Sequence, residues 1–237
     1  MAAAKEKKER NKKTTSSVIN EKLNDFVQKN RRILVLGLIV VVVILIGFIV
    51  SISVRQKIQT AAFSKLDGYS QRYEDLKSYI GSDKPDAASK QGDITTLLND
   101  LSAFQKKNYG FAAAKAYSLS AGIYDTQKNW ADAEKAWSAA AKAAPKSYLA
   151  PVSVFNAAVA SEEQGNIAQA IDYYTQALTY GNEFPSAARA QFSVGRLQES
   201  QNNKDAALSA YKNLVSKWPS DPLWANLAQS RIMVLSE

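Results

Sequence analysis

The sequence predicts an all-α protein in which a single N-terminal transmembrane helix precedes a solenoid of repeated helix pairs. Two observations favour this fold class. An apolar stretch of 22 residues covers positions 33–54. Beyond residue 110 the chain is rich in alanine and repeats itself with a period of 37 residues, which is typical of a helical array. No segment shows the sustained alternation of apolar and polar residues that indicates a strand.

The composition excludes several classes of chemistry. The 237 residues include no cysteine and no histidine, which removes thiol nucleophiles, imidazole acid–base groups and the usual zinc sites. The sequence contains no glycine-rich phosphate loop, nucleophile elbow or paired-carboxylate motif. Glu162 and Glu163 are adjacent, and a solvated helix face explains them better than acid–base catalysis does. We therefore expect no enzyme activity, no metal, no cofactor and no small-molecule substrate.

The excess positive charge lies beside the apolar stretch. Residues 1–32 contain ten Lys or Arg and four Asp or Glu, which is a net charge of +6 out of the total of +8. Arg55 and Lys57 supply the other two positive charges, so residues 58–237 are neutral overall. A neutral domain lacks the basic field that dominates nucleic-acid binding, and no nucleic-acid partner is expected.

The apolar stretch is long enough to cross a bilayer as a helix. About 20 residues are needed, and ILVLGLIVVVVILIGFIVSISV at 33–54 supplies 22. The alternative is a cleaved signal peptide, whose apolar core would be about 7–15 residues long with a small-x-small cleavage site after it. The sequence SISVRQKIQ offers no good site of that kind, so an uncleaved, single-pass anchor is predicted.

The charge bias predicts the orientation of this anchor. Basic residues stay in the cytoplasm, so residues 1–32 form a cytoplasmic tail and residues 55–237 are translocated. The first half of the tail is polar and highly charged, which predicts disorder. Residues 18–29 can form a short amphipathic helix that leads into the span.

Residues 55–110 are predicted to form two amphipathic linking helices. The first has an apolar face with steps of three and four residues, made by Phe63, Leu66, Tyr69, Tyr73, Leu76 and Ile80. Residues 81–92 form a loop by their Gly, Pro, Asp and Ser content, and Asp93 then caps the second helix, which ends near 108–110. The apolar face of this second helix comprises Ile94, Leu97, Leu98, Leu101 and Phe104.

The 37-residue period becomes visible when segments 129–145, 166–182 and 203–219 are aligned without gaps. An alanine, a large aromatic residue and a second small or aliphatic residue then coincide. The coinciding positions are Ala133, Ala170 and Ala207; Trp137, Tyr174 and Tyr211; and Ala140, Ala177 and Leu214.

This pattern resembles the tetratricopeptide repeat, which has a helix pair with small residues at the crossing point and aromatic residues between neighbouring pairs. The resemblance places repeats at about 114–147, 151–184 and 188–221 and a capping helix at 222–235. Two departures are that Asn182 stands where proline is usual, and Gln198 where tyrosine is usual. The residues that carry the resemblance are expected to be core rather than a ligand cage: Tyr117, Ala121, Tyr124, Ala133, Trp137, Ala140, Pro145, Ala170, Tyr174, Ala177, Ala207, Tyr211 and Pro219.

The resemblance also implies a partner-binding groove, since in such domains the first helix of each pair lines the concave surface. The positions transferred in this way are Lys115, Ser118, Asp125, Phe155, Val159, Glu162, Arg189, Phe192, Arg196 and Glu199. Phe155 and Phe192 occupy the same repeat position. Either they offer an apolar wall to a protein segment, or they pack between helices.

The whole layout resembles the bacterial YfgM-type proteins, which are ancillary subunits of the Sec translocon. The shared features are the basic tail, the single span, the Leu98-x-x-Leu101-x-x-Phe104 helix and the following repeats. The resemblance implies an inner-membrane protein with a periplasmic domain that binds translocon subunits, chaperones or exported clients. The alternative is an envelope scaffold that coordinates cell-wall synthesis or outer-membrane assembly.

Overall fold

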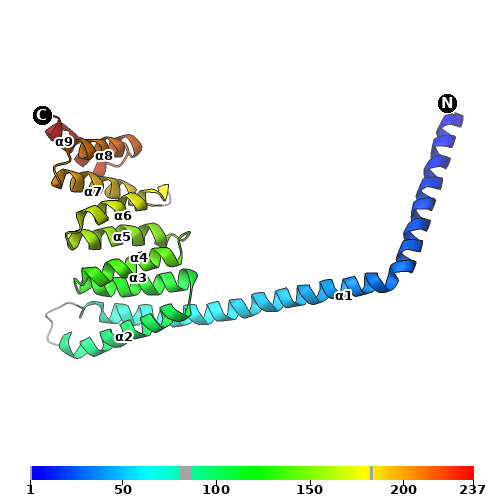
Figure 1. The fold of residues 1–237 in the computed structure, drawn as a ribbon, viewed down its shortest axis with the longest axis horizontal. Helices are drawn as coiled ribbons and strands as arrows, with labels where there is room; N and C mark the ends of the chain where they lie inside the picture. The colour runs from blue at the N-terminus through cyan, green and yellow to red at the C-terminus, as the bar shows by residue number, and fades with distance from the viewer. Residues whose placement is uncertain (1, 81–86, 182–183) are drawn as a thin grey trace. The chain divides into compact units, whose positions relative to one another are not determined.

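The computed structural model describes residues 2–80, 87–181 and 184–237, and all regular secondary structure in these ranges is helical (Figure 1). The chain divides into two compact units, residues 1–58 and 59–237. The helices are α1 (Ala2–Lys77), α2 (Ala87–Lys107), α3 (Gly110–Thr126), α4 (Trp130–Ala143), α5 (Leu149–Glu163), α6 (Ile167–Leu178), α7 (Ala187–Ser200), α8 (Lys204–Lys217) and α9 (Trp224–Ser236).

The first unit consists of the N-terminal part of α1. In the described part of the chain, its segment Val18–Ser53 is the only helix long and apolar enough to be a candidate membrane span. The large apolar side chains from Ile33 to Ile52 are exposed, so no protein core covers them. The polar Ser53 satisfies itself within the helix, because its Oγ donates to the carbonyl of Ile49 at 3.0 Å. An apolar surface with internally satisfied polar groups is what a lipid environment requires.

The helix α1 begins earlier than the sequence analysis expects. Residues 2–17, for which disorder is predicted, are helical and continuous with the segment that follows. The reason is local composition, because Ala, Lys, Glu and Arg are strong helix formers and neither glycine nor proline interrupts the chain before Gly37. Residues 18–29 are helical as predicted, but they form part of α1 rather than a separate element.

The second unit is a stack of antiparallel helix pairs (Figure 1). The pairs are α3 with α4, α5 with α6, and α7 with α8, and α9 packs on α8. We call α3, α5 and α7 the A helices and α4, α6 and α8 the B helices. Alanines at the crossing points, including Ala133, Ala170 and Ala207, are fully buried and allow close approach. Each pair contacts mainly its neighbours, which is the packing logic of a solenoid.

The turn inside each pair has the same backbone geometry. One residue adopts the left-handed conformation, with φ of 57° at Lys128, 77° at Gly165 and 60° at Asn202. The next residue is an asparagine in all three pairs, and its N–H donates at 2.9 Å to the carbonyl five residues earlier. Those asparagines are Asn129, Asn166 and Asn203. The 37-residue period therefore fixes the turns as well as the helices.

The C-terminal part of α1 forms a further helix pair with α2, and this pair precedes α3 in the chain. The predicted apolar faces are confirmed, because Leu66, Leu76 and Ile80 are buried in one cluster with residues of α2 and α3. Arg72 donates to the Asp100 carboxylate at 2.6 Å across this pair. The predicted cap at Asp93 is wrong, since α2 begins at Ala87 and Asp93 lies within it. The rest of the predicted loop, residues 81–86, lies outside the described residues.

Candidate protein-binding surface

Each helix pair contains a hydrogen bond from an aromatic side chain of its B helix to a carboxylate of its A helix. Trp137 Nε1 donates to Asp125 at 2.7 Å. Tyr174 Oη donates to Glu162 at 3.2 Å, and Tyr211 Oη donates to Glu199 at 3.0 Å. We call these three contacts the acid–aromatic bonds. They hold the polar atoms of large side chains that are buried or half-buried and fix the rotation of each A helix against its B helix.

Two of the three carboxylates are also bridged by an arginine from the next A-type helix. Arg196 on α7 reaches both oxygens of Glu162 on α5, at 2.6 and 2.8 Å. Arg231 on α9 donates to both oxygens of Glu199 on α7. Asp125 has no such arginine among the described residues. Arg196 lies 34 residues after Glu162, but the residue 34 positions after Asp125 is Val159. Ion pairs therefore join α5 to α7 and α7 to α9, whereas the Asp125 carboxylate on the first A helix is bound by Trp137 and is open to a positive charge.

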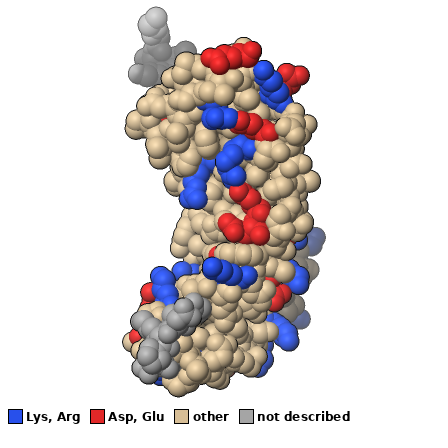
Figure 2. Space-filling model, turned by 90° about the vertical axis from the view of Figure 1, so that its left-hand side faces the viewer, with Lys and Arg blue, Asp and Glu red and all other residues tan. Residues whose placement is uncertain are grey.

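Figure 2 shows acidic and basic side chains next to one another along one face of the molecule.

The carboxylates of the acid–aromatic bonds differ in their environments. Hydrogen bonding from Arg231 is the main cause that lowers the pKa of Glu199. Burial instead raises the pKa of Asp125, and the hydrogen bond from Trp137 offsets only part of that effect. Asp125 is thus a partly desolvated acid that a positive charge would stabilise.

Burial, followed by the hydrogen bond to Glu199, raises the pKa of Tyr211 to about 12. An unfolded tyrosine titrates near its ordinary value of about 10. Between these two values the unfolded chain loses a proton that the folded chain keeps, so the free energy of unfolding must fall as the pH rises. Below about pH 10 the contribution of Tyr211 is fully present.

We expect Tyr211→Phe to remove this part of the alkaline pH dependence. Urea unfolding of both proteins between about pH 9 and pH 12 measures it. The free energy of unfolding should fall more steeply for the wild type than for the variant, because Phe has no proton to lose. Parallel curves would contradict the assigned environment of Tyr211.

The predicted groove positions on α3 form no ion pair among the described residues. Lys115, Ser118 and Asp125 are partly exposed, and the side chain of Lys115 has no ion pair among the described residues. The predicted positions further along the chain are mostly engaged within the domain. Glu162, Arg196 and Glu199 take part in the ion pairs between helix pairs.

The prediction of Phe155 as a groove residue is wrong, because its side chain is only 5% exposed. Its ring contacts Tyr174 at 5.2 Å and Phe184 at 5.7 Å between centroids. Arg189 lies over the same ring, with 5.0 Å from its Cζ to the centroid, so this predicted groove residue partly covers Phe155. Phe155 is therefore a core residue between the second and third pairs.

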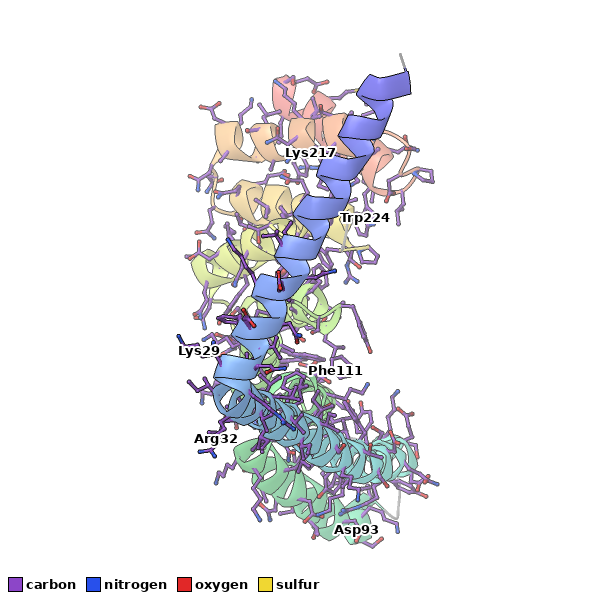
Figure 3. All side chains as sticks on the ribbon, turned by 90° about the vertical axis from the view of Figure 1, so that its right-hand side faces the viewer. Lys29, Arg32, Asp93, Phe111, Lys217 and Trp224 are labelled. Atoms are coloured by element: carbon purple, nitrogen blue, oxygen red, sulfur yellow. The ribbon has the colours of Figure 1, made fainter. Side chains whose placement is uncertain are left out.

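Phe192 is half-buried although it occupies the same repeat position. Its ring contacts Tyr211 at 5.4 Å and Trp224 at 5.3 Å between centroids. Trp224, which is labelled in Figure 3, lies at the start of α9. Val159 is half-buried and packs against the cluster that contains Phe155. These two residues thus pack mainly between helices and leave only part of their surface to a partner.

The residues that carry the repeat resemblance lie mostly where the pattern places them. Ala121, Ala140, Ala177, Tyr174 and Tyr211 are buried. Five other residues of this set are less buried. Tyr117, Tyr124 and Trp137 are half-buried, and Pro145 and Pro219 are exposed. The two prolines end or follow B helices and do not belong to the core.

Sequence reasoning missed the polar role of the core aromatics and the role of Arg231. A signal for the first was available, because an acid precedes each aromatic residue by 12 positions in all three repeats. Arg231 lies 32 residues after Glu199, whereas Arg196 lies 34 after Glu162, so no repeat rule predicts it. In the part of the chain that is described, no group of three or more acidic residues could hold a metal ion.

Residues 155–222, which contain most of α5 and all of α6 to α8, match the family model of the tetratricopeptide repeat. Over these residues the helix pairs are similar to tetratricopeptide repeats. The chain is also similar to a "TPR repeat-containing protein" from Treponema pallidum (strain Nichols), with 34% identity over 127 residues. The match covers 54% of this chain and 52% of the relative, so the chain spans about half the length of the curated relative it matches. Tetratricopeptide repeats of this kind indicate a protein–protein interaction module.

Proposed function

We propose that this protein is a membrane-anchored protein-binding module whose first A helix, α3, receives a charged segment of a partner. The observation that carries the proposal is the open pair of opposite charges on α3. Lys115 and Asp125 have no ion pair among the described residues, whereas the equivalent acids of the next two pairs are bridged by arginines. Charges without an ion-pair partner are available for charge-assisted bonds to a bound protein.

The topology supports a domain on the exported side of the membrane. The segment Val18–Ser53 is a candidate span, and ten basic residues precede position 33 while two follow position 54 closely. This bias favours a cytoplasmic N-terminus, so that residues after the span, including the repeats, are translocated. In a bacterium this arrangement places the repeats in the periplasm.

The proposed partners are subunits of the Sec translocon, periplasmic chaperones or newly exported chains. This assignment rests on the resemblance of the layout to the YfgM-type proteins. A module held next to the membrane and carrying a protein-binding surface is suited to meet segments as they emerge. It would bind them without a cofactor and without a covalent change.

Photocrosslinking in intact membranes tests both parts of the proposal. A photoreactive residue at position 118, between the open charges of α3, is expected to capture a partner that mass spectrometry can identify. Positions 176 and 212, exposed on the B helices α6 and α8, serve as matched controls and should capture much less. Translocon subunits, chaperones or exported chains at position 118 would support the proposal.

Charge reversal then separates specific from general contacts. Lys115→Glu in the position-118 variant should lower the yield of the crosslink at least about threefold, because the partner's acidic group would meet a like charge. Lys212→Glu, an equally drastic change on the exposed face of α8, should leave the yield unchanged. Equal capture at positions 118 and 212 would refute the surface. Capture of cell-wall synthases or outer-membrane assembly factors would instead assign the protein to the envelope scaffolds.

A further inference from the structure

One end of the repeat domain is basic. The turn from α2 to α3 and the turn from α4 to α5 lie at this end, together with the part of α1 around Phe63. Residues 101–124 and 135–161, which contain both turns, include six lysines and no Asp or Glu, although the domain is neutral overall. The connections further along the stack each contain an acid, Glu183 between α6 and α7 and Asp221 between α8 and α9. The positive charge is therefore concentrated at the two turns nearest to α1.

Three aromatic rings join these elements into one surface. The ring of Phe111, at the start of α3 and labelled in Figure 3, lies 6.2 Å from that of Phe63 and 5.6 Å from that of Tyr148 between centroids. Tyr148 is 68% exposed, and Tyr109, in the turn before α3, is 82% exposed. We call the exposed Lys and Tyr residues of the two turns the lysine–tyrosine end: Lys106, Lys107, Tyr109, Lys142, Lys146 and Tyr148.

The four lysines of the lysine–tyrosine end have no ion pair among the described residues. Lysines in the last turn of a helix offset its dipole, which explains part of the placement of Lys106, Lys107 and Lys142. Lys146 lies beyond α4, however, and a helix dipole gives no reason for an exposed tyrosine in each turn. Tyrosines beside lysines are typical of a membrane–water interface, where the rings lie at headgroup level and the ammonium groups meet anionic lipids.

The chain itself brings this end close to a membrane surface. Phe63 follows Val54, the last residue of the apolar stretch, by nine residues. Nine residues reach at most about 32 Å even when fully extended, so this limit holds for any angle between the two units. A surface held this close meets the lipids at a high effective concentration, and a weak attraction is then sufficient. An acidic segment of another protein has no comparable tether.

We propose that the lysine–tyrosine end lies on the anionic phospholipid headgroups of the membrane that α1 spans, on the exported side. The inference rests on the anchor of the proposed function and goes beyond it. Lys115 and Asp125, the charges proposed to bind a partner, lie further along α3 and are not part of this surface. Docking would hold the partner-binding face of α3 beside the bilayer, where exported segments emerge.

Fluorescence quenching in reconstituted vesicles tests the docking. The chain has no cysteine, so Ser147→Cys in the second turn gives the full-length protein a single site for a fluorophore. The vesicles contain phosphatidylcholine, phosphatidylglycerol and a lipid with a spin-labelled headgroup as the quencher. Ala168→Cys, exposed near the start of α6 at the opposite end of the pairs, is the matched control. We expect strong quenching at position 147, little at position 168, and a smaller difference in vesicles without phosphatidylglycerol.

Removal of charge tests the role of the lysines. Lys107→Gln with Lys146→Gln should lower the ratio of docked to undocked domain at least about fivefold, because each lysine near an anionic surface adds attraction. Lys128→Gln with Lys204→Gln removes the same charge at exposed positions of the opposite end and should leave the quenching unchanged. The melting temperature of both variants should stay near that of the wild type, because all four side chains are exposed.

The outcomes separate the docking from the anchor. A protein that does not float with the vesicles would refute the anchor and the docking together. If the protein floats but the label at position 147 is quenched no more than the label at position 168, the docking alone is refuted. Quenching that neither phosphatidylglycerol nor the lysine variant changes would contradict the proposed lipid contact. Photocrosslinking of position 147 to a protein in intact membranes, without quenching by lipid, would overturn the proposal and assign the surface to a protein partner.

Discussion

Gly195→Ala is expected to destabilise the third helix pair by about 1–3 kcal/mol. A Cβ added to Gly195 would lie 2.6 Å from Cε1 and 2.8 Å from Cδ1 of Tyr211. The ring of Tyr211 has little room to retreat, because it is fully buried, contacts Phe192 and donates its hydroxyl proton to Glu199. The steric cost should exceed the gain of up to about 1 kcal/mol that alanine normally brings to a helix.

Gly92→Ala is the matched control for this change. Gly92 lies within α2 and is exposed, and an added Cβ would have nothing within 4 Å. This variant should therefore gain about 0.5–1 kcal/mol from helix propensity alone. Urea unfolding of both variants gives the two free-energy changes, which should have opposite signs. Two changes of the same sign would show that contact with Tyr211 does not decide the effect at Gly195.

Tyr211→Ala is expected to have the largest effect of any single change considered, a loss of about 3–5 kcal/mol. The substitution removes a fully buried ring that closes the cluster between α7, α8 and α9. It also removes a hydrogen bond to Glu199. Because each helix pair contacts mainly its neighbours, the loss should appear as local opening of α7 to α9 before the first pairs unfold.

Hydrogen exchange resolved along the chain measures this local opening. Protection should fall in α7, α8 and α9 and remain near the wild-type level in α3 and α4. Tyr211→Phe, which keeps the ring and loses only the hydroxyl, should cost about 1 kcal/mol. Tyr109→Ala is the control, because Tyr109 is 82% exposed and its loss should change stability little. A uniform loss of protection along the domain would contradict the nearest-neighbour account.

The sequence was sufficient to predict the helices, their pairing and the candidate span. These features depend on local spacing, since an amphipathic period specifies a helix and a 37-residue repeat specifies a pair with its turn. The buried alanines and aromatics followed from the same period, because equivalent positions of a solenoid have similar neighbours. The local errors, at residues 2–17 and at Asp93, came from helix formation in segments whose polarity suggested disorder or a loop.

Only the tertiary structure decided which surface positions remain available to a partner. Phe155 and Phe192 share one repeat position, yet Phe184 and Arg189 cover the first while Trp224 contacts the second. The same holds for the carboxylates, since arginines at unequal spacings close two of them and leave Asp125 open. The repeat period identifies the residues that face a neighbouring helix pair. The exposure of each residue depends on side chains of that neighbour whose positions do not follow the period.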